Sequence, residues 1–272
     1  MNDHFFTTKE EIKDWLNKLE ITKYTIRDDL IVDVFETISL NYLYCKDYIP
    51  VQFGIIEGDF SCSYCELTTL KGCPNIVKGN FNCQRNSLST LKYFPQHIDA
   101  NIDCSGNNLT TLKGIPEVIN GKFCCSFNQL TNLIEGPKIV KGDFDCSVNK
   151  LITLEGCPEI GKTFYLNHNQ LTSLRYCPKN IKEHLVCHHN NINTFKYFPD
   201  NVVGVLDIHE NNLLEEECVN FNTYVQNSIQ SDFGDKTEFL ELVKKLKILQ
   251  ENNELNKIIA SDKSPEINKH RL

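Results

Sequence analysis

The residues with the clearest capacity for chemistry are cysteines and histidines. The pair Cys62-x-x-Cys65, followed by Cys73 and Cys83, offers four thiols, the number of ligands that a structural zinc site needs. Five of the eight histidines lie close together in the sequence, namely His168, His184, His188, His189 and His209. Imidazoles at this density can bind a transition metal or gain charge near neutral pH.

A repeat explains the spacing of these residues. One motif recurs eight times between Phe60 and Leu213, in steps of 21 residues with one step of 20. Each unit reads approximately Φ-x-C-x-x-N-x-L-x-x-L-x-x-Φ-P-x-x-Φ-x-G-x, where Φ is apolar, and the units begin at Phe60, Phe81, Ile102, Phe123, Phe144, Phe164, Leu185 and Leu206. The four cysteines occupy columns that are also filled in other units, so periodicity accounts for them. We therefore assign no metal ligand and no cofactor.

The motif predicts a solenoid. The Φ-x-C alternation has period 2, which indicates a short strand with both residues on one face. A unit of this length cannot bury that face alone, whereas stacked copies form a continuous parallel sheet. Proline recurs in the return path and favours extended, polyproline-like chain there. We expect an arc with the parallel sheet on its concave face and an irregular convex side.

Two columns of the repeat are expected to be structural. The cysteine of Φ-x-C should point inward as a small hydrophobe. The asparagine has donors and acceptors that can satisfy backbone groups of the turn after the strand. These side chains should stack as a ladder, formed by Asn86, Asn107, Asn128, Asn149, Asn169, Asn190 and Asn211.

The pattern resembles the leucine-rich repeat, whose core is L-x-x-L-x-L-x-x-[N/C]-x-L. Segments such as "FNCQRNSLSTLKYFP" and "FDCSVNKLITLEGCP" are similar to a variant found in large tailed phages, and the lead-in "YTIRDDLIVDV" resembles the segment that precedes such repeats there. One departure is an Ile or Val four residues before the first core position, where the family has leucine three before. This predicts a β-bulge at the start of the strand, often at Gly79, Gly121 or Gly142.

The repeat also sets the expected domains. Residues 1–59 should form an α/β N-terminal cap, with a helix that starts at the capping box Thr8-x-x-Glu11 and a hairpin within 24–34. A degenerate first coil follows at Ile38-Ser-Leu40, 22 residues before Phe60. The remaining expected parts are the repeats over 60–213, an α-helical C-terminal cap over 214–260 and a disordered tail over 261–272.

Composition narrows the classes of function and partner. A net charge of −8 disfavours nucleic acid and anionic membranes as partners. No signal peptide or membrane-spanning run is visible, and the inward cysteines are expected to be reduced, so we expect a cytoplasmic location. We expect a monomer or a weak homo-oligomer. No phosphate-binding loop, zinc-protease motif or nucleophile elbow is found, so no enzyme is predicted.

The outward strand positions form the candidate binding surface. Small side chains in its middle would let a partner approach closely, and outward aromatic residues are common interface anchors. Cys124 takes an outward position and should be exposed. Strand register should place His188 beside His209. The candidate partner-contacting residues are Tyr64, Arg85, Phe127, Val148, Tyr165, His168, His188, His189, His209 and Glu210.

These observations lead to one function and two alternatives. The expected function is non-enzymatic protein binding through the concave face. The phage resemblance implies a host protein as the partner, such as a defence factor, and the host cytoplasm as the location. The alternatives are a metal-dependent activity at the histidines and a structural or adhesion role in the virion.

Overall fold

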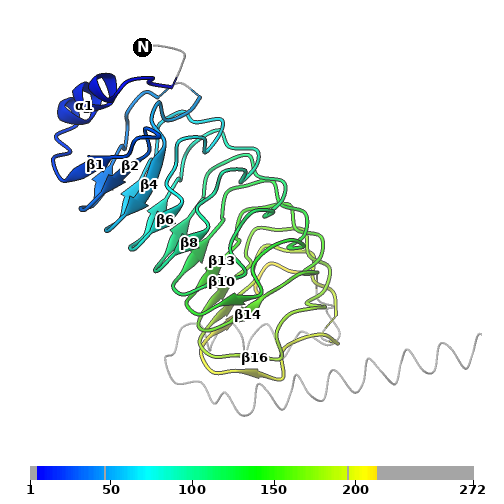
Figure 1. Cartoon of the computed structure of the whole chain (residues 1–272). Coiled ribbons are helices and arrows are strands. Elements are labelled where there is room, and N and C mark those ends of the chain that lie inside the picture. The colour runs from blue at the N-terminus through cyan, green and yellow to red at the C-terminus, as the bar shows by residue number, and fades with distance from the viewer. Residues whose placement is uncertain (1–4, 46, 195, 213–272) are drawn as a thin grey trace, which may run out of the picture.

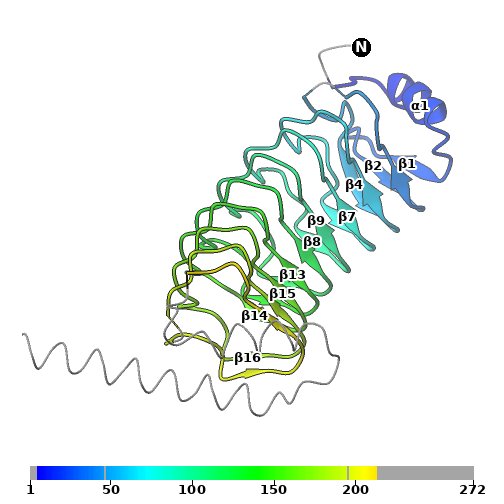
Figure 2. The ribbon, with the colours of Figure 1, turned by 180° about the vertical axis from the view of Figure 1, so that it is seen from behind.

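The chain forms a parallel β-solenoid whose turns contain about 21 residues, as the pairing of Phe60 with Phe81 shows. The computed structural model describes residues 5–45, 47–194 and 196–212. Figures 1 and 2 show the strands stacked along the long axis of the molecule, from the blue N-terminal end to the yellow end. The helical cap and tail that the sequence predicts over 214–272 lie outside the described residues. No helix within the described residues is long and apolar enough to cross a membrane.

The N-terminal elements follow the sequence prediction closely. Helix α1 (Lys9–Lys18) begins at a complete capping box, in which Thr8 accepts from the Glu11 backbone and Glu11 accepts from the Thr8 backbone. Strands β1 (Tyr24–Ile26) and β2 (Val32–Val34) pair as an antiparallel hairpin. The helix buries Ile12 and Leu16, and its Trp15 ring lies 6.4 Å from that of Phe53. Helix and hairpin therefore lie against the first coil (Figure 1).

The main sheet has nine parallel strands, one from each successive coil. Neighbouring strands pair in register, so each column of the repeat becomes a row of adjacent side chains. The first strand pairs with Phe60 through Ile38, in agreement with their offset of 22 residues. The strands are β3 (Ile38–Ser39), β5 (Phe60–Ser61), β7 (Phe81–Asn82), β9 (Ile102–Asp103), β11 (Phe123–Cys124), β13 (Phe144–Asp145), β15 (Phe164–Tyr165), β17 (Leu185–Val186) and β19 (Leu206–Asp207).

In each coil, a second short strand precedes the strand of the main sheet, and these strands form a second row. The sequence predicts a β-bulge at Gly79 and its equivalents, whereas the structure bends the chain over residues 78–80 and places the strands on either side in different sheets. A Cβ at Gly79 would lie 2.8 Å from the backbone nitrogen of Asp59, so the coils approach too closely here for a side chain. The strands of this row are β4 (Phe53–Ile56), β6 (Ile76–Val77), β8 (His97–Ile98), β10 (Val118–Ile119), β12 (Ile139–Val140), β14 (Glu159–Ile160), β16 (Asn180–Ile181) and β18 (Asn201–Val202).

The core is a stack of similar layers, one from each coil. The phenylalanines that start most coils are buried, and the rings of Phe123 and Phe144 stack with centroids 5.3 Å apart and an interplanar angle of 4°. The cysteine column is also buried, and every described cysteine is a free thiol. Burial raises the pKa of Cys104 and Cys125 well above the ordinary thiol value, so both are neutral small hydrophobes.

The asparagine column connects each coil to the one before it. Asn128 accepts from the backbone N–H of Leu109 at 2.9 Å. Its amide nitrogen donates to the carbonyls of Cys104 at 3.1 Å, Cys125 at 3.1 Å and Ser126 at 3.2 Å. Two of these four partners belong to the preceding coil. Only 3% of Asn128 is exposed, so water could not replace its side chain as the hydrogen-bond partner of these backbone groups.

The asparagine column generates the first prediction. Asn128→Ala should lower the free energy of unfolding by about 1–3 kcal/mol, because it leaves buried backbone groups unpaired. Denaturant unfolding of the full chain measures the change. Asn108→Ala is the matched control, since Asn108 is exposed in the corresponding turn of the preceding coil, and it should change stability by less than about 0.5 kcal/mol. Equal stability of the two variants would contradict a structural role for the column.

Candidate functional site

The outward positions next to the main sheet are largely occupied by internal hydrogen bonds. Asp103 accepts from the backbone N–H of Ser105 at 2.9 Å and from its hydroxyl at 2.6 Å. Asp145 binds Ser147 in the same way, at 3.0 and 2.7 Å. The serines are buried. The run of small residues is therefore not an open surface for a partner, which corrects the sequence analysis. An Asp or Asn two residues before a polar side chain is the local signal that could have shown this.

The next position in every coil has a left-handed backbone. We call this row of nine residues the ridge, and φ along it lies between 51° and 64°. This conformation costs a residue with a Cβ about 1–2 kcal/mol. Glycine avoids that cost, yet it occupies only one ridge position. The ridge consists of Tyr42, Tyr64, Arg85, Gly106, Phe127, Val148, His168, His189 and Glu210.

Ridge side chains contact one another between coils. The rings of Tyr42 and Tyr64 stack with centroids 4.9 Å apart. The guanidinium carbon of Arg85 lies 5.6 Å from the ring centroid of Phe127, two coils away. Arg85 reaches it across Gly106, where a Cβ would lie 2.8 Å from the Arg85 Cδ. Phe127 remains 51% exposed, so this cation–π contact is open to a partner.

Not all predicted contact residues belong to the ridge. Tyr165 is half-buried in β15, with the Lys122 ammonium 6.0 Å from its ring centroid. Val148 is on the ridge but half-buried. Phe127, Val148 and Tyr165 are all among the predicted contact residues, and the structure divides them between the ridge and the strand face. The sequence analysis missed Tyr42, which is 75% exposed, because Tyr42 precedes the first complete repeat.

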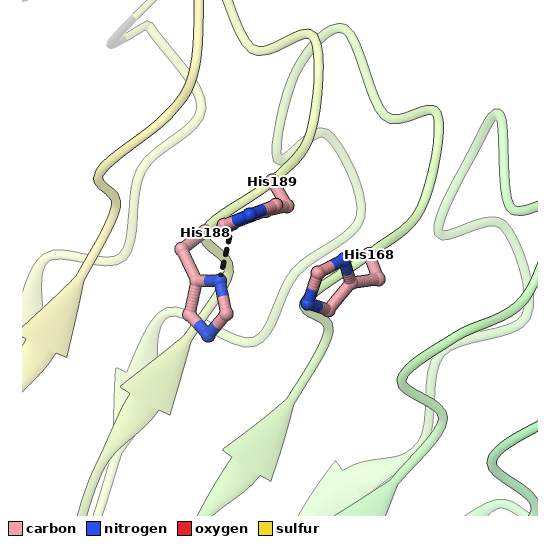
Figure 3. A group of neighbouring side chains, drawn as sticks. All are labelled: His168, His188 and His189. Atoms are coloured by element: carbon pink, nitrogen blue, oxygen red, sulfur yellow. Dashed lines mark hydrogen bonds between the residues drawn. The ribbon is translucent and has the colours of Figure 1, made fainter.

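The histidines gather on the last three coils. Figure 3 shows His168 facing His188 and His189 from the neighbouring coil. The Nδ1 atoms of His188 and His189 are 2.9 Å apart, and the rings of His168 and His189 have centroids 4.2 Å apart. His188 stacks on His209 at 4.5 Å, as strand register predicts. His184 does not join this cluster. Its Nδ1 instead accepts a hydrogen bond from the backbone N–H of Val205.

Two carboxylates face this cluster. Glu210 lies 2.7 Å from His189 Nε2. Asp207 hydrogen-bonds to His209 Nδ1 at 2.5 Å and lies 3.9 Å from His188 Nε2. Burial lowers the pKa of His188, an effect that Asp207 opposes and that the three other histidines reinforce. His188 is therefore neutral near pH 7, with a lone pair available for a hydrogen bond or an ion.

Two sets of side chains have the spacing of metal ligands. The ligand atoms of His168, His188 and His189 all lie within 4.8 Å of one another, and the same holds for His189, His209 and Glu210. The four thiols Cys62, Cys65, Cys73 and Cys83 form no such group in the described part of the chain.

Cys124 differs from its expected exposure. It is half-buried, and its Sγ lies 3.2 Å from the Ser126 hydroxyl and 3.6 Å from an Asp145 carboxylate oxygen. Burial, together with the charges of Asp145 and Asp103, raises the pKa of Cys124 to about 11. The thiolate is the nucleophile, so this thiol is weakly reactive near neutral pH.

The backbone strain of the ridge is testable at Val148. A β-branched residue at positive φ is a genuine outlier, and Val148→Gly should remove the cost of about 1–2 kcal/mol. Glycine in turn costs about 0.5–1 kcal/mol of chain entropy, so the net change should lie between zero and about 1.5 kcal/mol of stabilisation. Val186→Gly is the control, since Val186 is half-buried in a regular strand, and it should destabilise. Destabilisation of both variants to the same degree, measured by denaturant unfolding, would contradict ridge strain.

The raised pKa of Cys124 predicts how its alkylation depends on pH. Below its pKa the thiolate fraction rises tenfold per pH unit, so the labelling rate should keep rising between pH 7 and pH 9.5 without a plateau. Native iodoacetamide labelling, followed for each peptide by mass spectrometry, measures this rate. Cys104 and Cys125 should label only on unfolding. A plateau near pH 8.5 at Cys124 would show an ordinary exposed thiol.

Three comparisons with known proteins found no match. No protein-family profile, curated protein or solved structure matches the chain.

Proposed function

We propose that this chain is a non-enzymatic repeat protein that binds a protein partner through the ridge. The observation that supports this most is the retention of large side chains in a left-handed backbone conformation. Eight of the nine ridge residues have a Cβ, although glycine would relieve strain at each of them. Strain that persists in a regular scaffold indicates side chains kept for contact.

A second left-handed row in the same molecule supplies the comparison. It lies in the return path of successive coils and consists of Gly72, Tyr93, Gly114, Glu135, Gly156 and Tyr176. Glycine fills three of these six positions, but one of nine on the ridge. The three glycines have φ of 87–104°, outside the 51–64° range of the ridge, so the two rows differ in backbone as well as in side chains. We therefore base the proposal on the exposed side chains of the ridge itself.

The chemistry of the ridge suits protein recognition. Tyr42, Tyr64 and Phe127 are exposed aromatic residues, and Arg85 lies among them. Aromatic residues and arginine are enriched among the few side chains that dominate interface energies. The in-register coils hold these side chains in fixed relative positions, which reduces the entropy cost of binding.

The proposed partner is a protein of a bacterial host. The repeat resembles the leucine-rich repeat in the form found in large tailed phages, and that resemblance supports a role inside an infected cell. In this proposal the chain acts in the host cytoplasm, on a host factor such as a defence protein. The N-terminal helix and hairpin then act as a cap that covers the apolar end of the solenoid.

Capture from a bacterial host lysate with the immobilised full chain tests this proposal. Phe127→Ala and Arg85→Ala should each reduce the captured partner, with a loss of about 1–3 kcal/mol or roughly 5–150-fold in affinity. Tyr176→Ala is the matched control. Tyr176 is also aromatic, has a φ of 72°, is 49% exposed and has an arginine over its ring at 4.9 Å.

The control should bind normally, and thermal melts should show all three variants folded. Loss of capture by Tyr176→Ala alone would move the contact surface to the return path. Capture that is unaffected by every ridge substitution would reject the ridge.

A further inference from the structure

We propose that His168, His188 and His189 bind one divalent transition-metal ion of the zinc class. This inference is independent of whether the ridge binds a protein. It concerns a site to which the sequence analysis assigned no ligand, because spacing alone showed only that the histidines are neighbours. The structure adds the directions of their ring nitrogens (Figure 3).

The three rings converge on one space. His168 follows β15, while His188 and His189 follow β17, and these strands pair in register. The Nδ1 atoms of His188 and His189 face each other at 2.9 Å. Two nitrogens bound to tetrahedral zinc lie about 3.3–3.4 Å apart, given bonds of about 2.0–2.1 Å. The pair therefore needs to open by only about 0.4 Å to admit the ion.

A carboxylate sets the tautomer of His189 that such a site requires. Glu210 lies 2.7 Å from His189 Nε2, so it accepts the Nε2–H and leaves the Nδ1 lone pair directed at His188. Asp207 lies on the Nε2 side of His188 at 3.9 Å, which is beyond hydrogen-bond distance. Carboxylates that accept from the second nitrogen of metal-binding histidines are a regular feature of zinc sites.

Without an ion, the two facing nitrogens need a proton between them. Glu210 keeps the His189 proton on Nε2, so a neutral His188 donates its Nδ1–H to the lone pair of His189 Nδ1. A divalent ion can take both Nδ1 lone pairs when the His188 proton lies on Nε2 instead, on the side of Asp207.

The alternative set, His189, His209 and Glu210, fits less well. His209 Nδ1 is already engaged by Asp207 at 2.5 Å. Glu210 has 62% of its side chain exposed, so binding would have to immobilise it. We therefore assign Glu210 as a positioning residue rather than a ligand, and His209 as a packing partner of His188.

Calorimetric titration of the reduced full chain with Zn²⁺ tests the site, together with Co²⁺ absorption spectra. One ion should bind per chain, and the Co²⁺ complex should show d–d bands without the intense sulfur-to-metal band of thiolate ligation. His168→Ala and His189→Ala should each weaken Zn²⁺ binding at least tenfold. Glu210→Ala should weaken it by about 10–100-fold through the orientation of His189.

Matched controls separate the site from other histidines. His97→Ala should bind as the unmodified chain does, because His97 is exposed and pairs with Asp99 elsewhere in the solenoid. His209→Ala should retain binding. Loss of binding in His209→Ala but not in His168→Ala would move the ion to the alternative set and overturn this assignment. Unchanged affinity in His189→Ala, or a sulfur-to-metal band, would also overturn it.

Discussion

The hydrogen bonds of the asparagine column are the constraint on which the other features depend. The Asn128 side chain must point inward to reach two carbonyls of its own turn and two backbone groups of the preceding coil. The chain achieves this by placing Phe127 in the left-handed region. Four hydrogen bonds at about 0.5–1.5 kcal/mol each outweigh a backbone cost of about 1–2 kcal/mol. The same turn that directs asparagine into the core therefore directs the preceding side chain outward, and repetition of the turn creates the ridge.

Much of this arrangement could be predicted from the sequence, because a solenoid is nearly one-dimensional. Neighbouring coils make most of the contacts, so columns in the sequence become rows in space. This is why the inward cysteines, the pairing of Ile38 with Phe60 and the stacking of His188 on His209 follow from spacing alone. Features that depend on backbone angles did not follow. Gly106 is the single ridge residue whose type indicates a positive φ, and one glycine among nine ridge positions is a weak signal.

Other differences arose from side-chain hydrogen bonds within a coil. Alternation along a strand assigns the small residues Ser105 and Ser147 to the outward face. The aspartates two residues earlier bind them and bury them. Cys124 is half-buried for a related reason, because it lies between Ser126 and Asp145. Periodicity predicts which face a residue takes, but it does not predict how much of that face its neighbours cover.

The ridge and the proposed ion site share His168 and His189, so the two are physically coupled. An ion bound to these side chains would fix rings that are now partly exposed, and it would add two positive charges at the acidic end of the ridge beside Glu210. A partner that contacts this end would then bind the ion-loaded and ion-free forms with different affinities. By linkage the partner would change the affinity for the ion by the same factor. A partner that contacts only Tyr42, Tyr64 and Arg85 lies several coils away and would leave ion binding unchanged, because most contacts in a solenoid join neighbouring coils. The presence or absence of coupling would therefore show which end of the ridge the partner covers.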